Sequence, residues 1–494
     1  MIKNINKIET KKIYIHYLFG FLFSRLKFDN FKENDVEYNR HEIEDCFLRL
    51  INNNNYWKEN IDLKSVKLRI GDTDENQNII QYYLLINDPF LHMKSIPQKI
   101  SIIKKQSITQ RNNVWHKAEL KRYIRLYESG LGLYRVCVKI ELDKNKKDFL
   151  NVSDIISLTD AGSPISEITK PEMFKKERLE FYFKHQKINV FGLYINDITN
   201  LKEFFTNDIG KYMNGTRIGK IYEKVAWVEI DHKIVPSNNG TDEKHYFQNP
   251  YIFTCMEIPE EQFQKVSNNI KNDGLSFKKY KNNIVRKDVQ DILLRRIEPG
   301  QTSTSYVEKF TESIHGNLTN MCVSSRIFLN MHIRSTLFIS SDRTESVCIK
   351  ESSLPAILDT IELIRMRWYA YVILNRFLDL QIEKLYEEFN ILTENDSTEK
   401  ETLIELGKHQ ENIIRIKSEI LRVLELPLSY RRASATATTL YDRGEAIFDI
   451  KELQKIVMQK AQCLEQLYRS IDDVKSRIDF ESIEPNLDRI FQNK

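Results

Sequence analysis

The clearest alternation of apolar and polar residues lies in KRYIRLYESGLGLYRVCVKIEL, residues 121–142. From residue 134 to 142 every second residue is Tyr, Val, Ile or Leu, and Arg, Cys, Lys and Glu lie between them. A period of two is typical of a strand with one buried face. Two glycines in SGLG, 129–132, can adopt the positive φ of a hairpin turn, so a β-hairpin is expected here.

Further apolar runs predict more strands in the first three hundred residues. They are Leu179–Phe183, Ile188–Tyr194, Val225–Ile230 and Tyr251–Ile258. Residues 257–274 form a largely polar stretch that stops at a glycine, which predicts one short helix. This part of the chain is therefore expected to be β-rich.

From Leu354 onward the apolar period changes from two residues to between three and four. Nine of ten positions taken at alternating spacings of four and three are apolar. The ten positions are Ile357, Ile361, Ile364, Trp368, Tyr371, Asn375, Leu378, Ile382, Leu385 and Phe389. This spacing predicts a long helix that buries a stripe of side chains against a neighbouring helix.

Two more helices are predicted after the first. One covers roughly residues 399–426 and ends before Pro427, and the other covers about 446–480. The Ser-, Thr- and Ala-rich residues 429–439 between them are expected to form a loop. At 1.5 Å per residue these helices are roughly 40–55 Å long. The C-terminal region is thus predicted to be an antiparallel long-helix bundle or a coiled coil.

The stripe on the first helix is expected to mediate oligomerisation through Ile361, Trp368, Asn375 and Ile382. Asn375 is the polar position among the ten. A polar residue in such a stripe can fix the register or the number of helices, at a cost in stability. Alternatively, Asn375 faces a loop or water at the end of the bundle, and the sequence leaves both interpretations open.

Pro, Gly and hydroxyl residues in EPGQTSTS, 298–305, mark the clearest boundary between domains. The expected division is a β-rich N-terminal domain, 1–148; a second α+β domain, 149–300; a junction, 301–350; and a helical bundle, 351–494. The predicted fold class is therefore α+β, with the β-rich region first and the helices last.

Composition and charge narrow the class of protein. The 494 residues allow about two to four domains. A net charge of +4, from 74 Lys and Arg against 70 Asp and Glu, is too even to indicate a polyanion as the general partner. Six scattered cysteines without a C-x-x-C pair fit free thiols in a reducing compartment. The sequence has no run of about eighteen apolar residues, so we expect no transmembrane helix and a cytoplasmic location.

The stretch RNNVWH, 111–116, is similar to the motif of HEPN ribonucleases, in which Arg and a polar residue precede His. That resemblance implies that Arg111 stabilises phosphate charge and that His116 is the general acid or base of a metal-independent endoribonuclease. Arg binds phosphate oxygens and His titrates near neutral pH, so both residue types suit this chemistry. The alternative is a loop Arg and an ordinary His beside a buried Trp115.

Other kinds of site find less support. The ten histidines do not occur in HExxH or HxH patterns, so no metal ligands are predicted. GTRIGK, 215–220, lacks the spacing and the hydroxyl of a phosphate-binding loop, and no cofactor is expected. The basic stretch 277–288 could meet the phosphates of a nucleic acid, but such a run is more often a solvated face.

The order of a mixed α/β region followed by long helices, from about 306 to 480, resembles the cytosolic portion of CorA-type magnesium channels. CorA proteins continue into two membrane helices marked by Gly-Met-Asn, and this chain has neither. The resemblance therefore implies no ion transport. It implies a β-containing head and a helical stalk that together build an oligomer.

These observations favour a cytosolic, self-associating binding or sensor protein. Its β-rich head would recognise a ligand or partner, and its helices would join copies of the chain or partner helices. The Lys-, Asn- and Ile-rich composition points to a prokaryotic or phage-related source, with which a role in antiviral defence is compatible. The alternative is a ribonuclease that uses Arg111 and His116, and whether the chain is an enzyme stays open.

Overall fold

The computed structural model describes the chain in separate stretches. They are residues 8–22, 96–105, 111–126, 131–143, 149–160, 180–183, 186–188, 190–203, 250–264, 327–332, 335–342, 353–394 and 435–467, with short pieces at 49, 53–55, 68–69, 85–86, 292, 319–320 and 469–470.

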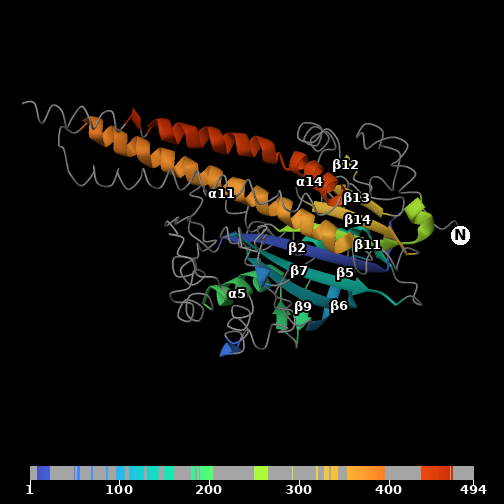
Figure 1. The fold of residues 1–494 in the computed structure, drawn as a ribbon. Coiled ribbons are helices and arrows are strands. Elements are labelled where there is room, and N and C mark those ends of the chain that lie inside the picture. Colours follow the sequence, from blue (N-terminus) through green and yellow to red (C-terminus); the bar gives the residue numbers. More distant parts are fainter. Residues whose placement is uncertain are drawn as a thin grey trace, which may run out of the picture. The chain divides into compact units, whose positions relative to one another are not determined.

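A ten-stranded sheet is the main feature of the fold (Figure 1). Its order is β10-β9-β5-β6-β7-β2-β11-β14-β13-β12, and β11 and β14 are the parallel pair among otherwise antiparallel neighbours. The strands are β2 (Lys12–Leu22), β5 (Ile96–Lys105), β6 (Arg111–Leu126), β7 (Leu131–Glu141), β9 (Glu180–Phe183), β10 (Gln186–Ile188), β11 (Tyr251–Ile258), β12 (Thr319–Asn320), β13 (Ile327–Met331) and β14 (Ser335–Ser341). Two short pairs lie outside it: β1 (Glu9–Thr10) with β8 (Leu150–Asn151), and β3 (Leu68–Arg69) with β4 (Leu85–Ile86).

The main helices are α3 (Val152–Asp160), α5 (Val190–Glu203), α11 (Ser353–Glu394) and α14 (Ala435–Ile447). Residues 450–467 are also helical. Helices and mixed sheets together give the α+β class that the sequence predicts. Among the described helices, none is long and apolar enough to cross a membrane.

The chain divides into two compact units. Unit 1 comprises Met1–Arg25, Glu33–Met366 and Ser429–Phe448, and unit 2 comprises Leu26–Lys32, Arg367–Leu428 and Asp449–Lys494. The large sheet takes strands from three of the four regions expected from the sequence, because β2, β11 and β14 are neighbours in it. The first part of α11 belongs to unit 1 and the rest to unit 2.

The two faces of the sheet carry different helices. Side chains alternate along a strand, so Tyr134 and Arg135 of β7 lie on opposite faces. Tyr134 donates a hydrogen bond to Asp197 of α5, whereas Arg135 pairs with Glu362 of α11. We call these the α5 face and the α11 face of the sheet.

Three of the predicted strands are confirmed. β7 contains the alternating residues 134–141, β9 matches the run that ends at Phe183, and β11 has the predicted bounds. β6 and β7 pair antiparallel, as the predicted hairpin requires. Gly132 begins this pairing, and a Cβ atom there would lie 2.1 Å from the ring of Phe21, so the close approach needs a glycine.

Two sequence predictions are wrong. Ile188–Tyr194 was expected to be a strand, but Val190 begins α5, and its buried residues recur at helical spacing as Val190, Leu193, Tyr194, Asp197 and Leu201. A short apolar run fits both periods, and the polar Asp197 hid the helical one.

The expected loop at 429–439 overlaps α14, which begins at Ala435. Buried residues at positions 440, 441, 444, 447 and 448 hold this helix despite its weak local propensity. The short helix predicted within 257–274 is confirmed over residues 260–264, and the rest of it lies outside the described residues. The predicted strand Val225–Ile230 and the predicted helix 399–426 also lie outside them.

Candidate binding site

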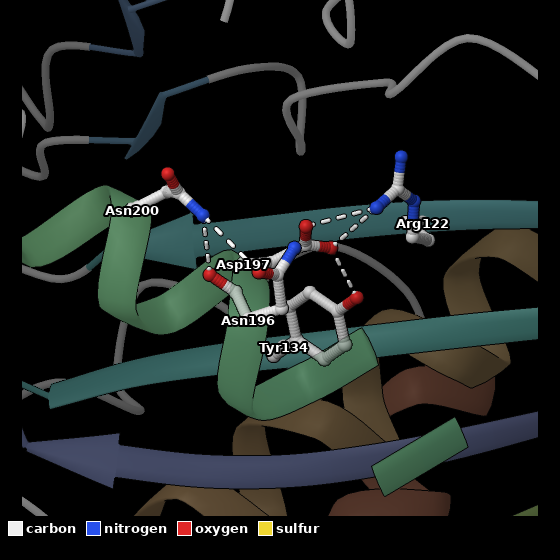
Figure 2. Close-up of polar contacts among 5 residues, drawn as sticks. All are labelled: Arg122, Tyr134, Asn196, Asp197 and Asn200. Atoms are coloured by element: carbon white, nitrogen blue, oxygen red, sulfur yellow. Dashed lines mark hydrogen bonds and ion pairs between the residues drawn. The ribbon is translucent and has the colours of Figure 1, made fainter. Parts of the chain in front are cut away.

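A buried ion pair on the α5 face joins α5 to the sheet (Figure 2). Nη1 of Arg122 lies 2.8 and 2.9 Å from the two carboxylate oxygens of Asp197, and the Tyr134 hydroxyl donates to the same carboxylate. In the same helix the Asn200 side chain donates to the backbone oxygen of Asn196, the residue before Asp197. Asp197 is fully buried.

This network has the properties of an anchor. A buried carboxylate is costly unless it is paired and hydrogen-bonded, and here one guanidinium and one phenol satisfy it. The aromatic rings of Phe19 and Tyr194 stack beside it, with centroids 4.4 Å apart. We therefore assign Arg122, Tyr134 and Asp197 to holding α5 on the sheet.

The α11 face carries a second buried pair. Nη1 of Arg135 lies 2.8 Å from Oε1 of Glu362. One turn farther along α11, the guanidinium of Arg365 lies 4.8 Å from the ring centroid of Tyr251 and 5.1 Å from that of Phe448. These contacts place the polar residues of α11 against the sheet and against the end of α14.

A set of partly exposed polar side chains lies on the same face, at the end of β2 that begins with Lys12. We call it the Tyr14 cluster: Lys12, Tyr14, Lys139, Glu141 and Glu257. Lys12 pairs with Glu257 at 2.8 Å, and Lys139 pairs with Glu141 at 3.0 Å. Both ammonium groups lie near the ring of Tyr14, at 5.8 Å for Lys12 and 5.9 Å for Lys139.

The sheet register builds this cluster from three strands. Tyr14 of β2 lies opposite Lys139 of β7 and opposite Cys255 of β11. Lys12 lies opposite both Glu141 and Glu257 in the same way. Residues more than two hundred positions apart in the chain therefore share one patch.

The next row of the sheet holds an imidazole and a thiol. Nε2 of His16 lies 3.8 Å from Sγ of Cys137, and both side chains are buried. Burial lowers the pKa of His16 well below its ordinary value, and the nearby Arg135 lowers it further. Burial also raises the pKa of the Cys255 thiol, with Glu257 adding to the effect. At neutral pH we therefore expect a neutral imidazole and a protonated Cys255.

Tyr14 is protonated for the same reason. Burial raises the pKa of its phenol, and this effect exceeds the opposite influence of the Lys139 ammonium. A neutral phenol is a hydrogen-bond donor and an apolar ring, not a nucleophile. The Tyr14 side chain is therefore suited to stacking and to hydrogen bonding.

Two buried polar atoms border the Tyr14 cluster without a hydrogen-bond partner among the described residues. They are Nδ1 of His16 and Oγ of Ser340. Ser340 lies opposite Glu257 in the β11–β14 register. A buried polar atom without a partner is unfavourable, so a bound molecule that reached these atoms would gain from pairing with them.

Arg111 and His116, the residues of the HEPN-like motif, both lie in β6. The register places Arg111 opposite Lys105 and His116 opposite Ile100 of β5. Positions five apart in a regular strand fall on opposite faces of the sheet. The strand alone does not bring the two positions together, and their catalytic role stays a prediction.

The residues expected to mediate oligomerisation occupy different environments along α11. Ile361 is fully buried in unit 1, and Trp368 is 9% exposed. Asn375 and Ile382, both in unit 2, are half-buried. Oδ1 of Asn375 has no hydrogen-bond partner among the described residues.

Local motifs did not reveal the Tyr14 cluster, although one signal was present. Within the apolar run of β2, the polar residues Lys12, Tyr14 and His16 recur at a period of two. Among the described residues no group of three or more His, Cys, Asp and Glu could hold a metal ion. Cys137 and Cys255 are free and buried, and Cys463 is free and exposed.

Comparison with known proteins gives no match: no family model, no curated protein and no solved structure resembles this chain closely enough to count.

Proposed function

We propose that the protein is a self-associating binding or sensor protein of the cytoplasm. Unit 1 recognises a ligand or partner on its sheet, and the helices of unit 2 join copies of the chain. A coiled-coil or antiparallel-bundle arrangement of the helices, the head-and-stalk assembly implied by the CorA resemblance and a role in antiviral defence belong to this proposal.

The helices of unit 2 support it. Leu374, Leu378 and Leu385 are buried on α11. Val457, Ala461 and Leu464 are buried on the helix 450–467. An ion pair between Lys460 and Asp379 joins the two helices. Such three- and four-residue spacing of buried positions is typical of helices that pack along their length.

The observation that carries the proposal is a second stripe on α11. Val372, Asn375 and Ile382 are half-buried, and Tyr386 is 49% exposed. These positions follow one another at three, seven and four residues, so they share one side of the helix beside the buried leucines. A half-exposed apolar stripe, with one amide oxygen that has no hydrogen-bond partner among the residues the structure describes, is suited to a further helix.

The test is a charge placed on this stripe. We expect Ile382→Lys to lower the molar mass in solution, measured by light scattering at several protein concentrations. Gln466→Lys is the matched control, because Gln466 is an exposed position of the helix 450–467, on the side away from the buried Val457. A wild-type monomer, or an Ile382→Lys variant with the wild-type mass, would show the proposal to be wrong.

Point variants test self-association more cleanly than a truncation that removes everything after residue 350. Such a truncation would also remove Glu362 and Arg365, which are buried in unit 1. The head would then lose part of its own core, and a change in mass would have two causes.

The ribonuclease alternative has its own test. If His116→Ala leaves RNA cleavage by the purified chain unchanged, or if the wild type cleaves no RNA, the alternative is excluded. Loss of cleavage with an unchanged unfolding transition would favour the enzyme.

A further inference from the structure

The Tyr14 cluster combines three features that a ligand site needs. It has a flat ring, partly exposed cations, and buried polar atoms with no hydrogen-bond partner within the described part of the chain. The ring belongs to Tyr14, which is half-buried, and the atoms without described partners are Nδ1 of His16 and Oγ of Ser340. These features come from four consecutive strands of the sheet, β7, β2, β11 and β14, so the site is rigid beneath its side chains.

The cations can respond to an incoming anion. Lys139 and Glu141 are 30% and 45% exposed, and an ion pair this exposed contributes little to stability. Giving up this pair with Glu141 therefore costs Lys139 little. Lys121, half-buried and opposite Cys137 on β6, adds a further cation on the same face. Lys12 is held more firmly, because its partner Glu257 is only 6% exposed.

Part of the Tyr14 ring is accessible, since the residue is half-buried and packs against Tyr123 and Cys137. The ammonium groups of Lys12 and Lys139 lie near the outer limit of the distance at which a cation interacts with an aromatic face. They can move aside while a planar ring takes their place. Planar bases stack on tyrosine regardless of their identity, and lysines beside such a ring meet phosphates.

We propose that the Tyr14 cluster binds a phosphorylated planar base, as a free nucleotide or as one residue of single-stranded RNA. The base stacks on Tyr14, and the phosphate lies at Lys139 and Lys121. This inference rests on the proposed function, in which unit 1 recognises a ligand, and it names the ligand class and the site.

The experiment uses the full chain with two probes: adenosine monophosphate by calorimetry, and a short labelled single-stranded RNA by fluorescence anisotropy. We expect Tyr14→Ala and Lys139→Ala each to weaken binding by about ten-fold or more, since stacking on one aromatic ring contributes that much. Tyr14→Phe, which keeps the ring, should bind nearly as well as the wild type. Lys455→Ala is the matched control, because Lys455 is a well-exposed lysine in a weak pair with Glu452.

If the mononucleotide binds, a free nucleotide is a sufficient ligand. If only the RNA binds, the ligand is the polymer. In both cases, weaker binding by Tyr14→Ala supports the site. No binding of either probe, or equal binding by wild type and Tyr14→Ala, overturns the inference. An unfolding scan checks that Tyr14→Ala folds. If it does not fold, the single variants Tyr14→Phe and Lys139→Ala still decide the test, because the first should bind and the second should not bind as tightly. Ile382→Lys should bind the probes normally, so a failure of self-association stays distinguishable from a failure here.

Discussion

α11 is one helix with one apolar period, but its two parts have different surroundings. From Ile357 to Tyr371 every side chain except Asp359 is buried, including Glu362, Arg365 and Arg367. Beyond Tyr371 the buried positions among the described residues recur at helical spacing and leave other sides exposed. Up to Met366 α11 is a buried helix of unit 1, and beyond Tyr371 it is a surface helix of unit 2 with a buried stripe.

The difference shows what the apolar period alone does not report. A helix with charges on one side is normally expected to expose them. In the first part of α11, the charges meet partners that lie far away in the sequence, such as Arg135 for Glu362 and Tyr251 for Arg365. Burial of these charges is tolerated because each has a partner.

Breaking one ion pair of each part of α11 tests this difference most directly. Glu362→Ala should lower the free energy of unfolding by about 3–5 kcal/mol, because it leaves the buried Arg135 without its partner. Lys460→Ala should lower it by less than about 1 kcal/mol, because Lys460 and Asp379 are 27% and 30% exposed. Urea unfolding of both variants measures the difference.

The double variant Arg135→Met with Glu362→Leu separates charge from packing. It should recover much of the loss, because no charge is then buried alone. Equal losses for Glu362→Ala and Lys460→Ala would show that the two parts of α11 do not differ in this way.

Two isoleucines, one in each part of α11, test the same difference through packing. Ile361→Ala should lower the free energy of unfolding by about 2–5 kcal/mol, since Ile361 is fully buried and a cavity is left behind. Ile382→Ala should cost less than about 1.5 kcal/mol, because Ile382 is already half-exposed. A loss at Ile382 as large as that at Ile361 would contradict the surface position assigned to it.

The sequence predicted the helices and strands better than it predicted which strands are neighbours in the sheet. The apolar period predicted α11 from Leu354, one residue after its start, and β7 and β11 almost to their ends. It missed α5, since seven residues from Ile188 to Tyr194 fit both a strand and a helix. Strand order was not predictable, because pairing between distant strands leaves little trace in the sequence.

The candidate site was less predictable still. The motif around Arg111 and His116 is contiguous and therefore visible, whereas Tyr14, Lys139 and Glu257 meet only through the register of three strands. The polar residues at every second position of β2 were a signal that the sequence prediction did not use. Nothing in the sequence predicted which residues of β7 and β11 lie beside them.

His16 gives a prediction about pH. Burial and Arg135 hold the pKa of its imidazole well below the ordinary value, whereas the unfolded chain takes up this proton near pH 6.5. Below about pH 6.5 the unfolded state therefore binds more protons, and the free energy of unfolding falls as the pH drops. The contribution of His16 is up to about 1.4 kcal/mol per pH unit.

Urea unfolding at several pH values between neutral and mildly acidic measures this slope. His16→Gln should flatten it, because glutamine does not titrate. The groups that face His16 are Cys137, Arg135 and the ring of Phe253, which is tilted at 5.6 Å, and the variant keeps all three. An unchanged slope in His16→Gln would assign the pH dependence to other groups.

The smallest expected effect concerns Asp449, between α14 and the helix 450–467. Its φ of 49° lies in the left-handed region, and its carbonyl accepts the first backbone hydrogen bond of the following helix, from Leu453. Glycine adopts this conformation freely, whereas alanine pays a penalty of about 1 kcal/mol. Asp449→Gly should therefore leave the free energy of unfolding within about 0.5 kcal/mol of the wild type, and Asp449→Ala should lower it by about 1 kcal/mol. Equal stability of the two variants would mean that the helix 450–467 begins without a left-handed residue, and that the break after Phe448 has another cause.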